Sequence, residues 1–321
     1  MGLYRPLRYN VGLIVTVTIN PAIDRIVSVD RLAFEDRGYI LSRAEAAGGR
    51  GINASRVIHQ FGAQTIAVVP SGGSTGKRFE EDMQHLGFPY VAVPIKQAIR
   101  TNLILTDKHG LTIKLNEPGP RLSPKEVARF EETVAGTLKN ASWLLLCGSL
   151  PPGVSVDFYC RLIDMAKARK VRTYVDTDGE FLQAALEHGP AVVAPNQQEA
   201  EALLNRSLIT RAHFREAVER LHGMGAEIAL LSLGSRGAVV MSAGKAYEIV
   251  APRVDAVSPI GAGDVLDAAF VWAMENKSDF VDAARWGVAA GTASATLPGM
   301  SVPNLDQTRA IYDRTEVKPL L

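Results

Sequence analysis

The sequence predicts an α/β protein with a doubly wound, mostly parallel sheet flanked by helices on both faces, and with a second, smaller β-sheet. Short apolar segments rich in β-branched residues alternate with segments of helical periodicity along most of the chain. The apolar segments are nearly continuous, which is typical of parallel strands buried on both faces. Two other segments alternate between apolar and polar residues, which indicates strands with one exposed face.

The strands predicted for the main sheet are residues 13–19, 64–70, 142–147, 171–176, 191–196 and 227–233. The helices predicted between them are residues 51–62, 123–138, 155–169, 196–204 and 210–224, and residues 261–315 are predicted to be mostly helical. Ser123 and Pro124 indicate one helix start, because serine is a good N-cap and proline suits the first helical turn. Repeated strand–helix–strand units have right-handed crossovers, which favours a doubly wound sheet.

The alternating segments at residues 24–45 and 90–116 are predicted to form antiparallel strands of one small sheet. The run Asp107-Lys108-His109-Gly110 suits a hairpin turn within the second segment. A small sheet over the crevice of an α/β domain could act as a lid. We therefore predict one domain over residues 11–315 with two inserted lid segments, and an N-terminal tail at residues 1–10.

The composition argues against several classes of partner. The net charge of +1 gives no basic surface for nucleic acid or for a membrane. The apolar run near the N-terminus is too short for a membrane helix and continues without a signal-peptide cleavage site. Cys147 and Cys160 fall in predicted core segments, which favours a reducing, cytoplasmic setting. The six histidines are scattered, and none of their spacings suits a zinc site.

The stretch Gly261-Ala262-Gly263-Asp264 places a carboxylate after a tight glycine turn at the start of a predicted helix. Free N–H groups at a helix start bind anions, so the amides could hold a transferring phosphoryl group while Asp264 accepts a hydroxyl proton. The alternative is a glycine-rich turn in which Asp264 only caps the helix. The stretch alone does not decide between these interpretations.

Two segments near the N-terminus suggest a site for a polyol. Residues 46–55 form a glycine-rich turn that leads into a helix, and Asn53 can both donate and accept hydrogen bonds. This turn is not a Walker A motif, because the Lys-Ser/Thr pair is missing. Asp24 lies beyond the carboxyl end of the first predicted strand, where open α/β sheets bind ligands. The alternatives are an ordinary loop before a helix and a surface turn.

Two further turns follow predicted strands. Asn196 and Glu199 suit a helix capping box, or they could lie near Mg²⁺ through bound water, since this ion keeps much of its hydration shell. Residues 232–237 could pass beside nucleotide phosphates or form an ordinary hairpin. Neither turn is specific by itself.

Taken together and in this order, the segments resemble the ribokinase-like (PfkB) carbohydrate kinase family from about residue 13 to residue 312. GGRGIN at residues 48–53 and GAGD at residues 261–264 are similar to the two family signatures. Further landmarks match at residues 147–153, 175–179, 195–199 and 232–237. NPAID, SLPPG and RTNLIL resemble the phosphosugar branch: 1-phosphofructokinase, tagatose-6-phosphate kinase and the minor 6-phosphofructokinase. The joint occurrence is far more specific than any single match.

The resemblance implies a ribokinase-like fold, with ATP and Mg²⁺ as cofactors. It assigns the general base to Asp264 and an anion hole to Gly261, Ala262 and Gly263. Residues implied to hold the sugar phosphate are Asp24, Gly49 and Asn53, with Arg100 at the distal phosphate, where a planar guanidinium is suited. Residues implied on the ATP side are Ser232, Gly234, Gly237 and the helix at 287–295. Asn196 and Glu199 are implied to organise Mg²⁺ through water.

The sequence departs from the family pattern on the nucleotide side. Arg50 and Ala194 stand where lysine is common, and Cys147 stands where serine is usual. The loss of a lysine at position 194 removes one cation near the nucleotide and is expected to weaken ATP binding.

Two further departures concern the substrate side and the catalytic helix. Tyr39 stands where this branch tends to carry asparagine or arginine, and we consider Arg37 a candidate to supply the missing charge. Asp267 lies one turn after Asp264 on the same helix face. Two buried carboxylates at this spacing would raise the pKa of one of them.

We therefore expect an ATP-dependent kinase that phosphorylates a hydroxyl group of fructose 1-phosphate, fructose 6-phosphate or tagatose 6-phosphate. One alternative is a ribokinase- or nucleoside-kinase-like enzyme, but a neutral substrate would not need the cation of Arg100. Another is a catalytically weak sugar-phosphate sensor, which Ala194 would suit. A dinucleotide-binding oxidoreductase is rejected, because NPAIDR stands where G-x-G-x-x-G is required. The free edges of a lid sheet favour a homodimer through the lid.

Overall fold

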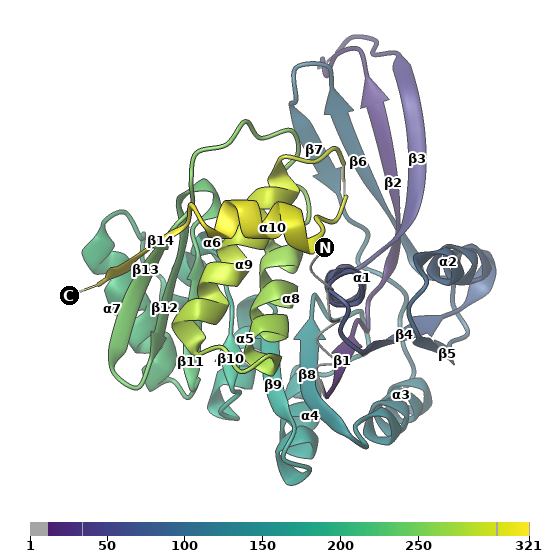
Figure 1. Cartoon of the computed structure of the whole chain (residues 1–321). Helices are drawn as coiled ribbons and strands as arrows, with labels where there is room; N and C mark the ends of the chain where they lie inside the picture. Colours follow the sequence, from purple (N-terminus) through teal and green to yellow (C-terminus); the bar gives the residue numbers. More distant parts are fainter. Residues whose placement is uncertain (1–11, 34, 300, 321) are drawn as a thin grey trace, which may run out of the picture.

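The computed structural model describes residues 12–33, 35–299 and 301–320, and it contains a large main sheet and a smaller sheet that projects from it (Figure 1). The predicted N-terminal tail at residues 1–10 lies outside the described residues. The smaller sheet stands above one end of the main sheet, where Figure 1 shows its strands in purple and blue.

The main sheet has ten strands among the described residues. In spatial order they are β5 (Tyr90–Pro94), β4 (Thr65–Ser71), β1 (Leu13–Val17), β8 (Ala141–Cys147), β9 (Arg172–Asp176), β10 (Val192–Val193), β11 (Ile228–Ser232), β12 (Gly237–Ser242), β13 (Lys245–Val250) and β14 (Glu316–Pro319). The strands from β5 to β11 are parallel, and β12 to β14 continue the sheet in antiparallel pairs. The predicted mostly parallel sheet is confirmed, and β14 extends it beyond the predicted domain end at residue 315.

Alternate residues of the central strands contribute to two separate hydrophobic cores, one on each face of the sheet. In β8, for example, Leu144 and Leu146 pack into one core, whereas Trp143 and Leu145 pack into the other. This double burial explains why the strand sequences are continuously apolar. The carboxyl ends of the strands remain uncovered by either core, and polar residues follow them.

Each face is covered by its own set of helices. Those that contribute to the core of Trp143 are α1 (Arg50–Gln60), α8 (Ala262–Glu275), α9 (Phe280–Ala295) and α10 (Leu305–Tyr312). Those on the opposite face are α2 (Gly73–Leu86), α3 (Pro124–Thr137), α4 (Phe158–Ala168), α5 (Gly179–Glu187), α6 (Gln197–Leu204) and α7 (Arg211–Gly223). Ser123 caps α3 with Pro124 as its first residue, as predicted. In the described part of the chain, no helix is long and apolar enough to cross a membrane.

The small sheet, called the lid below, has the strand order β3 (Ile40–Gly48), β2 (Ala22–Val29), β6 (Arg100–Asp107) and β7 (Thr112–Leu115). Strands β2 and β3 are antiparallel, as are β6 and β7, while β2 and β6 pair in parallel. The two predicted insertions therefore do form one sheet, and the predicted turn at Asp107–Gly110 joins β6 to β7.

The second lid segment is shorter than predicted. Tyr90–Pro94 is strand β5 of the main sheet, paired in parallel with β4, so the lid resumes only at Arg100. The assignment of residues 90–99 to the lid was wrong because helix α2, which connects β4 to β5, was not predicted. Helix α2 begins with Gly73, Ser74, Thr75 and Gly76, and such residues carry no apolar periodicity.

Candidate active site

Two cavities lie at the carboxyl ends of the parallel strands, where open α/β sheets bind ligands. One, of about 490 Å³, lies between the lid and the main sheet and is called the lid cavity. The other, of about 920 Å³, extends along α8 and α9 and is called the outer cavity. Asn196, Ser232, Pro259 and Gly263 line both cavities, so the two meet at the start of α8.

The start of α8 places Asp264 at this junction. Gly261 has a left-handed backbone (φ 78°), which turns the chain into the helix, and Asp264 follows in the first helical turn. The amide of Ala262 donates to Pro259 O at 3.3 Å, whereas the amides of Gly263 and Asp264 have no acceptor within the helix. The amide of Ala262, which was predicted to belong to the anion hole, is thus already used. The amides of Gly263 and Asp264 remain available to an anion in the cleft.

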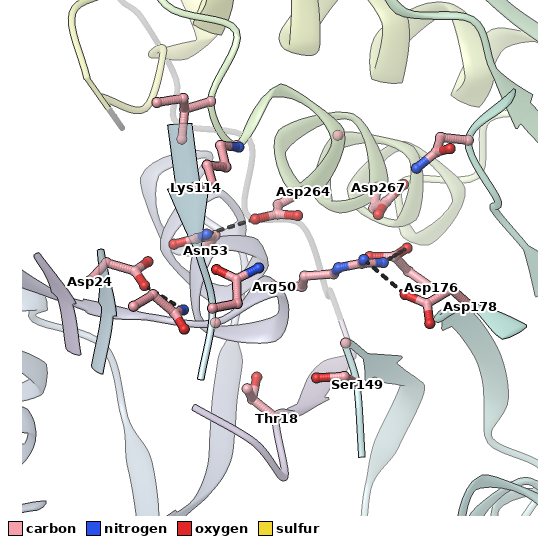
Figure 2. A pocket seen from close by; sticks show the side chains of 18 of the residues that line it. Thr18, Asp24, Arg50, Asn53, Lys114, Ser149, Asp176, Asp178, Asp264 and Asp267 are labelled. Atoms are coloured by element: carbon pink, nitrogen blue, oxygen red, sulfur yellow. Dashed lines mark hydrogen bonds and ion pairs between the residues drawn. The ribbon is translucent and has the colours of Figure 1, made fainter. Parts of the chain in front are cut away.

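Asp264 has the protonation behaviour of a base that works near neutral pH. Its desolvation, followed by the negative charge of Asp176, raises its pKa to about 7, although the Asn53 side chain donates a hydrogen bond to it at 2.6 Å. Figure 2 shows this bond at the centre of the cavity. A carboxylate with this pKa is ionised in half of the molecules at neutral pH and binds a proton more strongly than an ordinary aspartate does.

Helix α1 also begins at the cleft. Its N-cap Gly49 has φ 144°, and a β-carbon there would lie 2.6 Å from Thr18 Cγ2, so a side chain at this position would be strained and crowded. The absence of a side chain brings the first turn of α1 against β1. Asn53 lies in this turn and reaches Asp264, so the N-terminal ends of α1 and α8 converge on one point.

One face of the lid is polar and lines the lid cavity. Asp24 on β2 pairs in register with Asn102 on β6, and the Asn102 amide donates to Asp24 Oδ1 at 2.8 Å. Burial raises the pKa of Asp24. Lys114 on β7 pairs with Ile104, and Figure 2 shows its amino group between the lid and Asp264. These side chains share a face because residues two apart along a strand point the same way.

Several polar atoms around the lid cavity have no hydrogen-bond partner. Among the described residues, Thr18 Oγ1, Asn20 Oδ1, Arg100 Nε and Asn102 Oδ1 are buried and unpaired, and all four residues line this cavity. Buried polar groups are nearly always paired in folded proteins, so such a cluster indicates a polar ligand that completes the bonds. A sugar, which has a donor and an acceptor at each hydroxyl group, suits this lining.

Arg100 lies at the first position of β6 and borders the lid cavity. Its guanidinium donates to Glu117 O at 2.8 Å and to Asn20 O at 2.9 Å, so part of its donor set stabilises the surrounding loops. Its Nε and the second proton of each terminal nitrogen remain for a ligand. Burial, the largest effect, lowers the pKa of Arg100, yet arginine stays charged in proteins.

A set of acidic side chains surrounds Arg50 on the other side of Asp264. Arg50 Nη1 lies 2.7 Å from Asp176 Oδ1, and Nη2 lies 3.2 Å from Glu199 Oε1 and 3.5 Å from Asp178 Oδ2. Desolvation raises the pKa of both Asp176 and Glu199. Arg50 is thus the cation that compensates this acidic wall of the cleft, which the buried Ala194 also lines.

The outer cavity contains the residues expected on the ATP side. Ser232 ends β11, and Gly234 and Gly237 bound the short 3₁₀ turn η1 (Gly234–Arg236). Gly237 has φ 105°, and a β-carbon there would lie 2.0 Å from Ile249 O, so only glycine fits this turn. Val288, Gly291, Thr292 and Ala295 of α9 form the opposite wall, within the helix expected beside the adenine.

Asn196 and Glu199 form the capping box that the sequence allowed. Asn196 Oδ1 accepts from the Glu199 amide at 3.0 Å, and Glu199 Oε2 accepts from the Asn196 amide at 2.8 Å. The described residues contain no group of three or more His, Cys, Asp or Glu arranged to hold a metal ion. The side-chain oxygens of Asn196 and Glu199 suit an Mg²⁺ ion that is bound by phosphate oxygens and water, with the protein contacting only its outer shell.

All residues assigned to the site from the sequence line one of the two cavities except Arg37, and Tyr39, considered on the substrate side, is exposed and also lines neither. Arg37 lies exposed in the loop between β2 and β3, where Arg31 Nε donates to its carbonyl oxygen at 3.4 Å, and it lines neither cavity. Sequence analysis missed Lys114, Asn102, Asp176 and Asp178 as lining residues. The predicted turn at Asp107–Gly110 brings β7 back beside β6 but does not fix the register, and the structure pairs Lys114 with Ile104.

Comparison with known proteins agrees with this geometry. A crystal structure of phosphofructokinase-2 from Escherichia coli in complex with potassium is 31% identical to this chain, covers 94% of it and 99% of its own chain, and superposes with a TM-score of 0.88. The predicted ribokinase-like fold is therefore confirmed. Residues 14–307 match the model of the pfkB family carbohydrate kinases, and the chain belongs to this family.

Two curated relatives cover nearly the whole chain. The ATP-dependent 6-phosphofructokinase isozyme 2 of Escherichia coli is 32% identical over 302 residues, which are 93% of this chain and 97% of that protein. The 1-phosphofructokinase of Borreliella burgdorferi is 31% identical over 285 residues, 88% of this chain and 92% of that protein. The predicted resemblance to the phosphosugar branch is confirmed.

We predict that Asp264→Asn stabilises the protein at high pH. Because the pKa of Asp264 is about 7 in the folded protein and 3.8 in its ordinary state, folding favours the protonated form. Stability is therefore lost as pH rises from 3.8 to 7, and the whole penalty is present above pH 7. Thermal unfolding should show a melting temperature higher by about 5–8 °C in the variant at pH 8, and a smaller difference at pH 5.

The control is Asp313→Asn, which changes an exposed carboxylate at the end of α10. Its effect on melting temperature should be the same at both pH values. A difference for Asp264→Asn that is also independent of pH would contradict the raised pKa.

Proposed function

We propose that the protein is an ATP- and Mg²⁺-dependent kinase that transfers the γ-phosphate to a hydroxyl group of a ketohexose phosphate. The observation that carries this proposal is the position of Asp264, a base with a pKa of about 7, where a polar cavity under a lid meets a larger cavity. A hydroxyl group in the first cavity and a phosphoryl group in the second would both lie next to this carboxylate.

The reaction follows from these groups. Ionised Asp264 accepts the hydroxyl proton while the oxygen attacks the γ-phosphorus; the new O–P bond forms as the bond to the β-phosphate oxygen breaks, and ADP leaves. The amides of Gly263 and Asp264 stabilise negative charge on the transferring group. Lys114 approaches the same point from the lid. A closed lid excludes water, which limits hydrolysis of ATP.

Mg²⁺ would lie among the ATP phosphates, with Asn196 and Glu199 contacting it through water. When bound, it would neutralise phosphate charge and polarise the transferring group. Arg50, held by Asp176 and Glu199, supplies a fixed positive charge on the same wall. Ala194, which lacks the lysine expected from the family pattern, lines the same cavity as Arg50.

The distal phosphate of the sugar is assigned to Arg100. The Nε of Arg100 is buried without a partner, and Arg100 lines the lid cavity but not the outer cavity. The relatives named 6-phosphofructokinase and 1-phosphofructokinase favour a fructose phosphate. The buried, free cysteines fit a reducing compartment, and we assign the protein to the cytoplasm.

We predict ADP release from ATP and Mg²⁺ with one of the phosphosugars fructose 1-phosphate, fructose 6-phosphate and tagatose 6-phosphate, tested beside fructose, ribose and adenosine. Asp264→Asn should lower kcat by at least about 10³-fold, because the general base and its charge are both lost. A coupled assay of purified protein measures both. Turnover only on an unphosphorylated compound would contradict the assignment of Arg100, and a folded protein that neither turns over nor binds ATP would favour the sensor.

We predict that Arg100→Gln weakens phosphosugar binding specifically. Loss of charge-assisted hydrogen bonds to a phosphate should raise the KM for the sugar phosphate about 10–100-fold, because each such bond contributes about 1.5–3 kcal/mol. The KM for ATP should change little. Steady-state kinetics with each substrate varied in turn gives both KM values. Equal increases in the two would indicate that the Arg100 guanidinium acts only by holding the carbonyl groups of Glu117 and Asn20.

We also propose that two copies of the chain associate through their lids. The face of the lid opposite Asp24 carries Leu103, Leu105, Ile113 and Leu115, which follow the other alternation of β6 and β7. The first three are only half-buried, and Leu115 is exposed, as are Leu41 and Tyr39 at the other edge of the lid. An apolar sheet face of this kind is normally covered, and a second lid has the matching shape and chemistry.

We predict that the purified protein elutes with the mass of a dimer and that Leu41→Glu gives a monomer, because a buried unpaired carboxylate disfavours the interface. Light scattering after gel filtration measures the mass. The matched control is Ile209→Glu, which adds the same charge at an exposed residue outside the lid, before α7. A wild-type protein with the mass of one chain would rule out this assembly.

A further inference from the structure

A chain of hydrogen bonds runs behind Asp264 from β9 to α1, and the proposed mechanism does not use it. The Tyr174 hydroxyl donates to Asp267 Oδ1 at 2.7 Å, the Asp267 and Asp176 carboxyl groups are hydrogen-bonded to each other, and Arg50 donates to Asp176 at 2.7 Å. Asp267 and Asp176 are each only 6% exposed. Figure 2 shows Asp267 on α8 beside Asp264, with Asp176 facing Arg50.

Two carboxyl groups can share a hydrogen bond only if one of them carries a proton, because an ionised carboxylate is an acceptor alone. Asp176 is the member of the pair that faces a cation, since Arg50 lies 2.7 Å from its Oδ1. Asp267 has no cation at this distance, and one of its oxygens already accepts from Tyr174. The proton therefore belongs on the other oxygen of Asp267, from which it is donated to Asp176.

We propose that Asp267 is a positioning residue that stays protonated in the resting enzyme and, by donating to Asp176, holds Arg50 at the nucleotide side of the cleft. Asp176 then has a donor on each side, from Asp267 and from Arg50. With the Asp176 carboxylate fixed, Arg50 is directed toward Glu199 and Asp178 and toward the junction of the two cavities. This inference rests on the proposed kinase function for its effect on catalysis, but the protonation of Asp267 does not.

Burial and the neighbouring carboxylates favour the neutral form of Asp267, whereas the hydrogen bond from Tyr174 and the charge of Arg50 favour its ionised form, and burial is the largest of these effects. Tyr174 and Asp176 face Asp267 from β9, and Cys147 faces it from β8. Asp264 lies on the same helix, and the cation that acts on Asp267 is Arg50 of α1. Burial raises the pKa of Asp267 well above its ordinary value, and the charge of Asp176 raises it further. Burial also raises the pKa of the Cys147 thiol, which is therefore neutral. An ionised Asp267 would add a third carboxylate beside Asp264 and repel the phosphates of ATP.

The test compares two variants of Asp267 in the full chain. In Asp267→Asn the amide nitrogen can donate to Asp176 and the amide oxygen can accept from Tyr174, so the hydrogen-bond chain is retained without a titrating proton. In Asp267→Leu both hydrogen bonds are lost. If the proposal holds, the leucine variant should raise the KM for ATP and lower kcat by about tenfold each, and asparagine should restore most of both.

The pH profile of kcat/KM distinguishes a neutral Asp267 from a charged one. A neutral aspartic acid replaced by a neutral amide leaves the charge near Asp264 unchanged, so the acid limb of Asp267→Asn should stay where it is in the wild type. If Asp267 were ionised, the same change would remove a like charge, and the limb would move to lower pH by about one unit. That shift would overturn the proposal, as would a leucine variant with wild-type constants.

Infrared spectroscopy gives a second readout that needs neither turnover nor folding of the leucine variant. At pH 8, where Asp264 is mostly ionised, the spectrum of the wild type minus that of Asp267→Asn should contain the C=O stretch of a protonated carboxyl group. The matched difference for Asp313→Asn should not. Absence of the band in the first difference would overturn the proposal even in a fully active kinase. Its presence in a protein that phosphorylates none of the sugars would support the proposal and contradict the proposed function.

Discussion

The 2.6 Å hydrogen bond from Asn53 to Asp264 is the contact on which the rest of the site depends. It joins the first turns of α1 and α8, and each of these helices begins at a different part of the cleft. The amide of Asn53 orients the carboxylate without neutralising it. As a result, the desolvation that raises the pKa of Asp264 is partly offset, and the base stays close to its working range. Glycines at positions 49 and 261 are needed because both helices must start within reach of this bond.

The second constraint is the negative charge on the wall beyond Asp264. Asp176, Asp178 and Glu199 together would repel the phosphates of ATP. All three form ion pairs with Arg50, so they fix one guanidinium in the cleft and their charge is partly compensated. A planar fork can contact several carboxylates at once, whereas a lysine ammonium acts as a point charge. Arginine at position 50 therefore keeps the cation that the family pattern places on α1, in a form that several carboxylates can hold, whereas the cation expected at the end of β10 is absent at Ala194.

Much of the fold could be predicted because local sequence and global fold agree in it. Continuous apolar segments identified most of the parallel strands, and Ser123 identified the start of α3. Helix α2 was missed, since its first turn of Gly, Ser and Thr has no helical periodicity and only its packing through Phe79 and Met83 stabilises it. The site showed a similar limit. Motifs identified Asp264, Asn53 and Asp24, but Asp176 and Asp267 form a pair only through the positions of β9 and α8, which no local pattern contains.

The lid has a polar face and an apolar face, because successive residues of its strands point to opposite sides of the sheet. Even-numbered residues such as Asp24, Asn102 and Lys114 line the cavity, while the odd-numbered Leu103, Leu105 and Ile113 point to the opposite face. A shift of one residue in the β2–β6 register would exchange the two faces and remove Asp24 from the cavity. Any contact that covers the apolar face, including a second lid, therefore also fixes the register on which the polar face depends. An interface that stabilises the apolar face of the lid would therefore also stabilise the geometry of the sugar site, because the same four strands form both.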